Sequence, residues 1–353
     1  MRILHVTDNL RVGGVQTVVV DLANGQSRRG HTVGIAAGDG ELWKDVDAAV
    51  ARVEPIRSGR GPAIVKARRA LVSQRWDVVH THQRGVSTVV WLVRKGLPLR
   101  HVEHVHSVFL PVSHPRVSFR GEALISCGPA VTRMLTEDYG KPVADIHTVL
   151  NGVADHGHRA RVPERRSGPL VLMNVARVTE VKDPARFVRI VGRLREAGLD
   201  VVGRWVGGGE LLDHMRHEAA ELGLASAIEF VGPQRPAAGW LEDADIFLST
   251  SRVEGLPLSL LEACAAGLPV IAPDVGSVSA IVSEGQNGRL YDPTLPDELV
   301  AQIVLEVARQ DLTTLGRRSR EIYDKSFSLD RVLDEVDLVY EQMVNLPKAI
   351  AVR

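Results

Sequence analysis

The chain has 353 residues, of which 44% are hydrophobic, and its 43 Lys and Arg residues balance its 43 Asp and Glu residues. This length and apolar content fit a globular protein of two domains, and zero net charge argues against a nucleic-acid-binding protein. Its two cysteines, Cys127 and Cys264, lie in apolar surroundings, which disfavours a disulfide framework and indicates a reducing compartment.

We expect a cytoplasmic protein. The N-terminus, MRILHVTDNL, has one basic residue and an apolar run too short for a signal peptide. No stretch approaches the roughly 18 apolar residues of a membrane span.

Short apolar runs alternate with longer helical patterns, which predicts the α/β class with parallel strands. After the first run comes Gly13-Gly14 and then a helix, because Val15, Val18 and Leu22 recur at helical spacing. The polar segment 156–169 is typical of a linker. In this first half we expect strands at 2–6, 32–37, 77–81, 100–106, 123–127 and 146–150.

The second half repeats the pattern and predicts a second doubly wound unit. We therefore draw the domains at 1–160 and 161–328. A final helix is expected at 329–344, where Leu329, Val332, Leu333 and Val336 share one face. Strands are expected at 170–175, 201–206, 228–231, 245–249 and 269–272.

The stretch SRVEGLPLSLLEACAAGLPVIA places two glutamates eight positions apart. Pro257 and Gly267 bound a predicted helix at 258–266, and Glu262 lies among apolar residues in its middle. An unpaired buried carboxylate costs several kcal/mol, so Glu262 needs a partner or a ligand-filled cleft. Glu254 lies in the loop before the helix, where free N–H groups attract anions such as phosphate.

Two cations follow the strand at 170–175. Arg177 and Lys182 stand five positions apart, and such a pair suits a diphosphate, because Arg offers a planar fork and Lys a point charge. Solvated surface charges are the alternative. The loop lacks the glycine fingerprint of dinucleotide sites, which disfavours a nicotinamide cofactor.

Glycines mark two further predicted loops. Gly13-Gly14 lets the backbone approach a bulky or charged ligand group, although a plain tight turn explains it equally well. The glycines of WVGGGE, residues 205–210, lack the spacing of a nucleotide fingerprint and are weak evidence.

Two histidine-rich segments raise the question of a metal site. Segments 78–85 and 100–108 each contain His-x-His, but no cysteine or carboxylate pair accompanies them, so we predict no metal. His106, at the end of its strand, could instead contact a substrate; a hydrogen-bonded strand-end histidine is the alternative. The Asp-x-Asp of residues 242–247 precedes a strand and is better explained by helix-end solubility.

Together these features resemble the retaining GT-B glycosyltransferases, the large family that includes sucrose synthases and bacterial mannosyl- and N-acetylglucosaminyl-transferases. The resemblance covers nearly the whole chain, and its most specific part is Glu254-x7-Glu262. The other matching features are Gly13-Gly14, ISCGPAVTRML (125–135), VLNGV (149–153), Arg177-x4-Lys182 and the Asn-Gly at 287–288.

The resemblance implies two facing Rossmann-like domains with a cleft between them and a nucleotide-sugar donor held mainly by the second. In such a site Arg177 and Lys182 would neutralise the diphosphate, and Glu262 would accept hydrogen bonds from the ribose. Glu254 would bind hydroxyl groups of the donor sugar. The backbone of Gly255, Leu256, Pro257 and Leu258 would line the sugar and phosphate pocket.

The resemblance also assigns roles to the first domain. Gly14 would let that domain close over the phosphates, and His106 would lie near the sugar's C6 region or the reacting centre. The last helix, about 329–345, would pack back onto the first domain. Transfer would retain the anomeric configuration and need no metal or other cofactor, because two cations and a helix N-terminus stabilise the leaving group.

The chain departs from the family at two places. Many relatives carry Gly-Gly-x-Pro-Glu after the last core strand, whereas this chain has VGSVSAIV at 275–282, which keeps Gly276 but not the second glycine or the Pro-Glu pair. Ala176 stands before Arg177, where relatives usually have glycine.

Other functions fit the same fold, since a fold does not fix a reaction. A sugar-nucleotide epimerase or phosphorylase is one alternative, and a non-catalytic sugar-nucleotide-binding scaffold is another, disfavoured because both glutamates and both cations are present. The sequence does not name the sugar, the base, the hydroxyl acceptor or the oligomeric state. The acceptor loops are expected to include 106–121.

Residues 57–76 form a basic segment in which Ile64, Ala67 and Leu71 lie close to one helical face. Peripheral binding to anionic lipid at the inner membrane surface is one interpretation. A sheet-covering helix with a solvated basic face is the favoured one.

Overall fold

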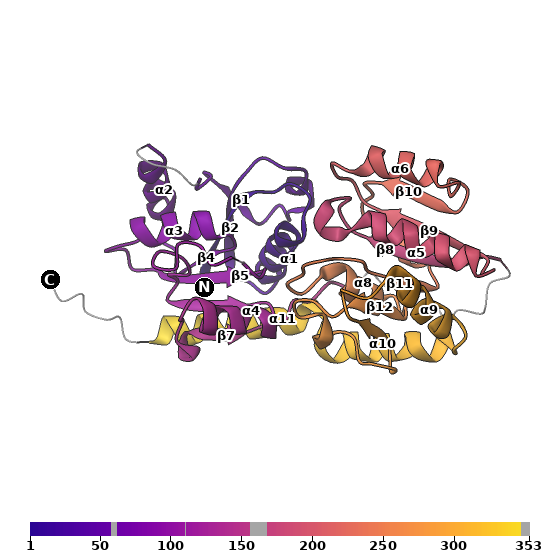
Figure 1. The fold of residues 1–353 in the computed structure, drawn as a ribbon. Helices are drawn as coiled ribbons and strands as arrows, with labels where there is room; N and C mark the ends of the chain where they lie inside the picture. The colour runs from indigo at the N-terminus through magenta and orange to yellow at the C-terminus, as the bar shows by residue number, and fades with distance from the viewer. Residues whose placement is uncertain (58–61, 110, 156–167, 347–353) are drawn as a thin grey trace. The chain divides into compact units, whose positions relative to one another are not determined.

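The computed structural model describes residues 1–57, 62–109, 111–155 and 168–346, which form two compact units (Figure 1). The first unit comprises Met1–Ala154 together with the chain from Leu329 onward, and the second comprises Asp155–Ser328. The boundary expected at residue 160 and most of the linker expected at 156–169 fall on residues outside the described ones.

The first unit is built on a seven-stranded parallel sheet with the order β3-β2-β1-β4-β5-β6-β7. Its register pairs His5 of β1 with His80 of β4. The strands are β1 (Arg2–Asn9), β2 (Thr32–Gly38), β3 (Ala51–Val53), β4 (Val78–Thr81), β5 (Arg100–Val105), β6 (Ala123–Ser126) and β7 (Ile146–Thr148).

Helices α1 and α11 pack against each other, and the contact requires a glycine. Gly25 of α1 faces Leu333 of α11, and a Cβ atom at residue 25 would lie 2.5 Å from Cδ1 of Leu333. The chain thus returns to the first unit after completing the second. The helices of the first unit are α1 (Gly14–Arg28), α2 (Pro62–Val72), α3 (Arg84–Val93), α4 (Pro129–Arg133) and α11 (Leu329–Asn345).

Helix α2 lies on the apolar core of the first unit. Its Ala67 and Leu71 are buried in one apolar cluster with β-strand residues such as Leu4 and Val79, whereas Ile64 is exposed. This packing supports the sheet-covering interpretation for the helical part of residues 57–76, Pro62–Val72, whereas residues 58–61 lie outside the described ones. Binding to lipid stays a prediction.

The second unit is built on a six-stranded parallel sheet with the order β10-β9-β8-β11-β12-β13. Its core includes Phe187, Trp205 and Ile271, all fully buried. The strands are β8 (Leu170–Val175), β9 (Val201–Val206), β10 (Ile228–Gly232), β11 (Ile246–Leu248), β12 (Val270–Pro273) and β13 (Gly288–Tyr291). The helices are α5 (Pro184–Glu196), α6 (Leu212–Glu221), α7 (Ala238–Leu241), α8 (Leu258–Ala265), α9 (Asp297–Ala308) and α10 (Leu312–Ser326).

The two parallel sheets confirm the α/β class and the doubly wound organisation. All eleven strands expected from the sequence are present, but β3 and β13 were not predicted. Both are edge strands of three or four residues, ARV and GRLY, too short and too polar to produce an alternating pattern. Among the described helices, none has the length and apolarity needed to cross a membrane.

Candidate functional site

In the second unit, the candidate residues gather on loops that leave the carboxyl ends of neighbouring strands. Arg177 and Lys182 follow β8, and Glu254 follows β11, the next strand in the sheet. Loops after β9 and β12, which flank these two strands, complete the group. In open parallel sheets this edge is where ligands bind.

The glycine run after β9 supports the loop that carries Arg177. A Cβ atom at Gly207 would lie 1.9 Å from the carbonyl oxygen of Ala176, and one at Gly209 would lie 2.3 Å from that of Val178. The N–H of Val178 donates to the Gly208 carbonyl at 2.9 Å. From the sequence, the glycine run 207–209 is weak evidence for a nucleotide site. In the structure its glycines allow a close backbone contact that holds the loop carrying Arg177.

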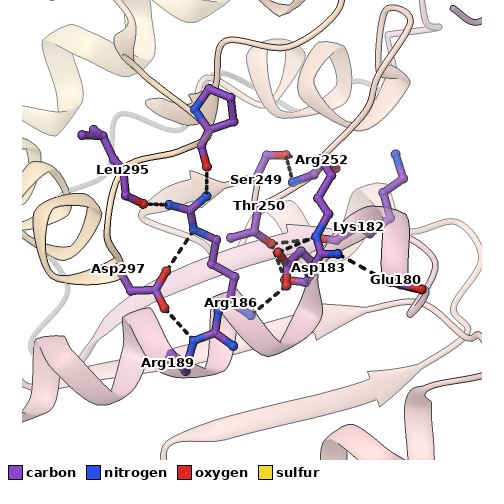
Figure 2. A network of polar contacts seen from close by, with 12 residues as sticks. Glu180, Lys182, Asp183, Arg186, Arg189, Ser249, Thr250, Arg252, Leu295 and Asp297 are labelled. Atoms are coloured by element: carbon purple, nitrogen blue, oxygen red, sulfur yellow. Dashed lines mark hydrogen bonds and ion pairs between the residues drawn. The ribbon is translucent and has the colours of Figure 1, made fainter. Parts of the chain in front are cut away.

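Side chains after β11 hold the loop at its other end, as Figure 2 shows. The hydroxyl of Thr250 donates to the carbonyl oxygens of Lys182 and Asp183, both at 3.0 Å. Arg252 donates through Nε to the Asp183 carboxylate at 2.9 Å and through its backbone N–H to the Val181 carbonyl at 2.8 Å. Lys182 is thereby fixed against the loop that carries Glu254.

Asp183 joins this arrangement to helix α5. Its backbone adopts a left-handed conformation with φ of 49°, and its side chain accepts a hydrogen bond from the N–H of Arg186 at 3.2 Å. The carboxylate therefore caps the helix and pairs with Arg252 at the same time. Sequence reasoning missed Asp183, although an Asp-Pro pair at a helix start is a readable capping signal.

Lys182 and Glu254 form an ion pair. Nζ of Lys182 lies 2.5 Å from Oε1 of Glu254, and the two side chains are 21% and 9% exposed. A cation and a carboxylate so placed can bind opposite parts of one ligand, such as an anionic group and a hydroxyl group.

The loop after β12 packs on the backbone of Glu254. Gly276 has φ of 61°, and a Cβ atom there would lie 2.0 Å from the Glu254 carbonyl oxygen. The N–H of Ser277 donates to the Gly255 carbonyl at 2.8 Å. The one family glycine that this altered loop keeps is thus the residue that touches Glu254.

Helix α8 begins at Leu258 and ends at Ala265, one residue before the predicted end. Leu256 and Pro257, which precede it, are buried. Glu262 is partly exposed, whereas its neighbours Leu261 and Ala263 are buried. The partial exposure of Glu262 fits the expectation that this carboxylate does not lie unpaired in an apolar core.

Of the predicted site residues, the structure brings Lys182, Glu254 and Gly255 together. Arg177 is exposed on the same loop as Lys182. Gly13 and Gly14 belong to the first unit, where Gly13 is the N-cap residue of α1 and Gly14 its first residue, and the Gly13 carbonyl accepts the N–H of Thr17 at 2.9 Å.

Comparison with known proteins gives a consistent result for both halves. Residues 12–156 match the model of glycosyltransferase family 4, and residues 159–312 match that of glycosyl transferases group 1. The chain belongs to the GT-B glycosyltransferases. The GT-B glycosyltransferase family expected from the sequence is thereby confirmed, while the retaining mechanism and the role of Glu254-x7-Glu262 stay predictions.

Individual relatives agree with this assignment. The glycosyltransferase is 29% identical, over 75% of its length and 66% of the relative's, to the D-inositol 3-phosphate glycosyltransferase of Geodermatophilus obscurus. It shares the fold of a glycosyltransferase from Rickettsia africae, with a TM-score of 0.85 at 21% identity over 98% and 99% of the two chains. The HepE protein of Anabaena in complex with UDP-glucose gives a TM-score of 0.84 at 18% identity over 97% and 100%.

The first unit of this glycosyltransferase contains a cluster of five imidazoles. His5 comes from β1, His80 and His82 from β4 and the residue after it, and His104 and His106 from β5 and the residue after it. Ring nitrogens of His5, His80 and His82 lie within 4.8 Å of one another, as do those of His82, His104 and His106. The two His-x-His segments, separate in the sequence, therefore share one site.

The cluster offers imidazole nitrogens, which are common metal ligands, but, within the described part of the chain, no other kind of ligand. Neither set of three includes a thiolate or a carboxylate from the described residues. Burial lowers the pKa of His5 to about 4 and that of His106 to about 3, so the rings are neutral at pH 7. That no metal takes part in catalysis stays a prediction.

The other motifs of the glycosyltransferase have structural roles. Asp245, the second aspartate of the Asp-x-Asp, precedes β11 and accepts the N–H of Val171 at 2.8 Å, so this carboxylate binds the backbone of β8. Cys127 and Cys264 are both buried and are not in a disulfide bond, and burial raises the pKa of the Cys264 thiol to about 12.

Proposed function

We propose that this glycosyltransferase moves a sugar from a nucleotide-diphosphate donor to a hydroxyl acceptor, with retention of anomeric configuration and without a metal. The observation that carries the proposal is the pair formed by Lys182 and Glu254, 2.5 Å apart on neighbouring loops of the second unit. One side chain suits the donor's phosphate and the other its sugar hydroxyl groups.

In this proposal the positive charge of Arg177 and Lys182 neutralises the diphosphate. Glu254 accepts hydrogen bonds from the donor sugar, while Glu262 accepts them from the ribose. The N–H groups of Gly255 and Leu256 point an electropositive backbone at the phosphates before helix α8 begins. The UDP-glucose complex of HepE, which has a similar fold, supports a donor of this class.

The chemical step is leaving-group stabilisation. The bond between C1 of the sugar and the diphosphate oxygen breaks, and the acceptor oxygen bonds to C1 from the same face. The departing phosphate oxygen takes the acceptor's proton, so no separate carboxylate nucleophile is required. A glycan, a lipid-linked saccharide or a small metabolite can supply the hydroxyl group.

Thermal-shift screening tests the proposal, because a ligand that binds only the folded state raises the melting temperature. The purified chain is screened against nucleoside diphosphates and nucleotide sugars, each with and without EDTA. We expect one nucleotide sugar to raise the melting temperature by the same amount in both conditions. No shift with any donor, or a shift abolished by EDTA, contradicts the proposal.

A further inference from the structure

A continuous chain of hydrogen bonds runs through the first unit from α11 to the end of β5. Gln26 donates through Nε2 to Oδ1 of Asp337 at 2.9 Å, and Oε1 of Gln26 lies 2.8 Å from Nε2 of His5. Nδ1 of His5 lies 3.0 Å from Nε2 of His82. Nδ1 of His82 in turn lies 3.1 Å from Nε2 of His106. All four distances are within the normal range of hydrogen bonds.

The carboxylate of Asp337, at one end of the hydrogen-bond chain, determines which atom donates in each of its hydrogen bonds. Asp337 forms ion pairs with Arg29 and can only accept, so Gln26 turns its N–H to Asp337 and its oxygen to His5. A neutral imidazole has one donor and one acceptor nitrogen. His5 therefore carries its proton on Nε2, and both following rings repeat this tautomer.

The last ring has an unused acceptor. With its proton on Nε2, His106 keeps a lone pair on Nδ1, and this atom is buried without a hydrogen-bond partner among the described residues. Leaving a buried polar atom unpaired costs about 1–3 kcal/mol. A hydroxyl group that donates to Nδ1 removes this cost.

We propose that the hydrogen-bond chain from Asp337 to His106 fixes the tautomer of His106, with the proton on Nε2 and with Nδ1 left as the acceptor. A substrate hydroxyl group, which the family resemblance already places near His106, would donate to this Nδ1. Asp337, Gln26, His5 and His82 are then positioning residues. The tautomer of His106 follows from the hydrogen bonds alone, whereas the contact of His106 with a substrate rests on the proposed function.

Geometry favours this chain over a metal centre in the same cluster. The rings of His104 and His106 stack with centroids 3.9 Å apart and planes 24° apart. Lone pairs lie in the plane of each ring, so those of stacked rings run side by side and do not converge on one ion. The 3.0 Å and 3.1 Å contacts of His82 are accounted for by hydrogen bonds.

Nuclear magnetic resonance of the full chain with ¹⁵N-labelled histidine tests the tautomers without any substrate. We expect His5, His82 and His106 to be neutral at pH 7.5 with the proton on Nε2, each signal assigned by its loss in the corresponding His→Gln variant. A proton on Nδ1 of any of the three overturns the proposal. So does one equivalent of zinc retained by the dialysed protein and lost in His82→Gln.

Substitutions at Asp337 and Gln26, the end of the hydrogen-bond chain farthest from His106, test in which direction its N–H groups donate. In Asp337→Asn the amide can donate, so Gln26 can turn over and the three rings shift toward the Nδ1–H tautomer. Gln26→Glu combined with Asp337→Asn places an acceptor-only carboxylate next to His5 and restores the original tautomer. Asp334→Asn is the matched control, because Asp334 lies on the same helix and pairs with Arg29.

Kinetics then test the role of His106. We expect Asp337→Asn to lower kcat by at least about 10-fold, the double variant to recover most of it, and Asp334→Asn to match the wild type. Weaker donor binding in Asp337→Asn assigns the hydroxyl group to the donor, and unchanged donor binding assigns it to the acceptor. Equal kcat in all variants overturns the proposal. A wild type without transferase activity refutes the proposed function and leaves the tautomer result standing.

Discussion

The Nζ atom of Lys182 lies 2.5 Å from Oε1 of Glu254, although 72 residues separate the two in the sequence. The parallel pairing of β8 with β11 brings their loops together, and Thr250 and Arg252 bind the first loop to the second. Lys182 and Glu254 therefore meet at the carboxyl ends of β8 and β11, where they form an ion pair with each other.

Removing either partner of this pair should abolish most transfer. In Lys182→Ala the diphosphate loses a positive charge, and in Glu254→Gln the donor sugar loses a charged acceptor. We expect kcat/KM to fall by about 100-fold or more in each variant, measured as release of the nucleoside diphosphate. Glu180→Gln, on the same loop and largely exposed, is the control and should stay near wild type. Near-normal transfer in a pair variant removes that residue from the mechanism.

Arg186 should contribute far more to the stability of the second unit than Arg189. Both bind the carboxylate of Asp297 (Figure 2), but the side chain of Arg186 is 9% exposed and that of Arg189 is 47% exposed. Arg186 also donates to the carbonyl oxygens of Pro293 and Leu295. We expect Arg186→Met to lower the free energy of unfolding by about 3 kcal/mol and Arg189→Met by under about 1 kcal/mol, measured by urea titration. Equal losses contradict this difference.

Acid should destabilise the first unit through its buried histidines. Burial lowers the pKa of His101 from 6.5 to about 3, so the unfolded state binds protons that the folded state does not between these values. The stability that neutral His101 contributes is fully present above pH 6.5 and lost as the pH falls toward 3. His101→Gln should therefore flatten the fall in urea midpoint between pH 7 and pH 5, and the exposed His217→Gln should not. Identical pH profiles for both variants refute this account.

Glu103 should act in the opposite direction. Burial raises its pKa from 4.5 to about 7, so the folded state keeps a proton that the unfolded state loses. Stability is then lost as the pH rises from 4.5 to 7, by about 3 kcal/mol at the upper end. Glu103→Gln keeps an oxygen for the N–H of Gly121 and should raise the melting temperature at pH 8 relative to wild type, with little change at pH 5. A lower melting temperature at both pH values contradicts the assignment.

The sequence predicted those features that are local. Helix α8 could be delimited to within one residue because Pro257 and Gly267 mark its ends. Eleven strands could be predicted from apolar runs, whereas β3 and β13 are too short to form a pattern. The candidate residues Arg177, Lys182 and Glu254 could be chosen because cations and carboxylates stood next to strand ends.

The rest depends on contacts between distant segments. The contact of Gly207 with the Ala176 carbonyl joins positions 31 residues apart, and a glycine run alone does not reveal its partner. The bond between Gln26 and Asp337 spans 311 residues and requires α11 to return to the first unit. Neither side chain belongs to a motif, so only the structure could connect them to the histidines.

Transfer to an acceptor in the presence of EDTA, with the product's anomeric configuration read by proton nuclear magnetic resonance, tests the central claim most directly. The donor is the nucleotide sugar identified by thermal shift, and simple sugars and lipid-linked saccharides serve as acceptors. We predict that product forms at the same rate with and without EDTA and keeps the configuration of the donor. An inverted product, or product that forms only when a divalent metal is added back, would contradict metal-independent retaining transfer.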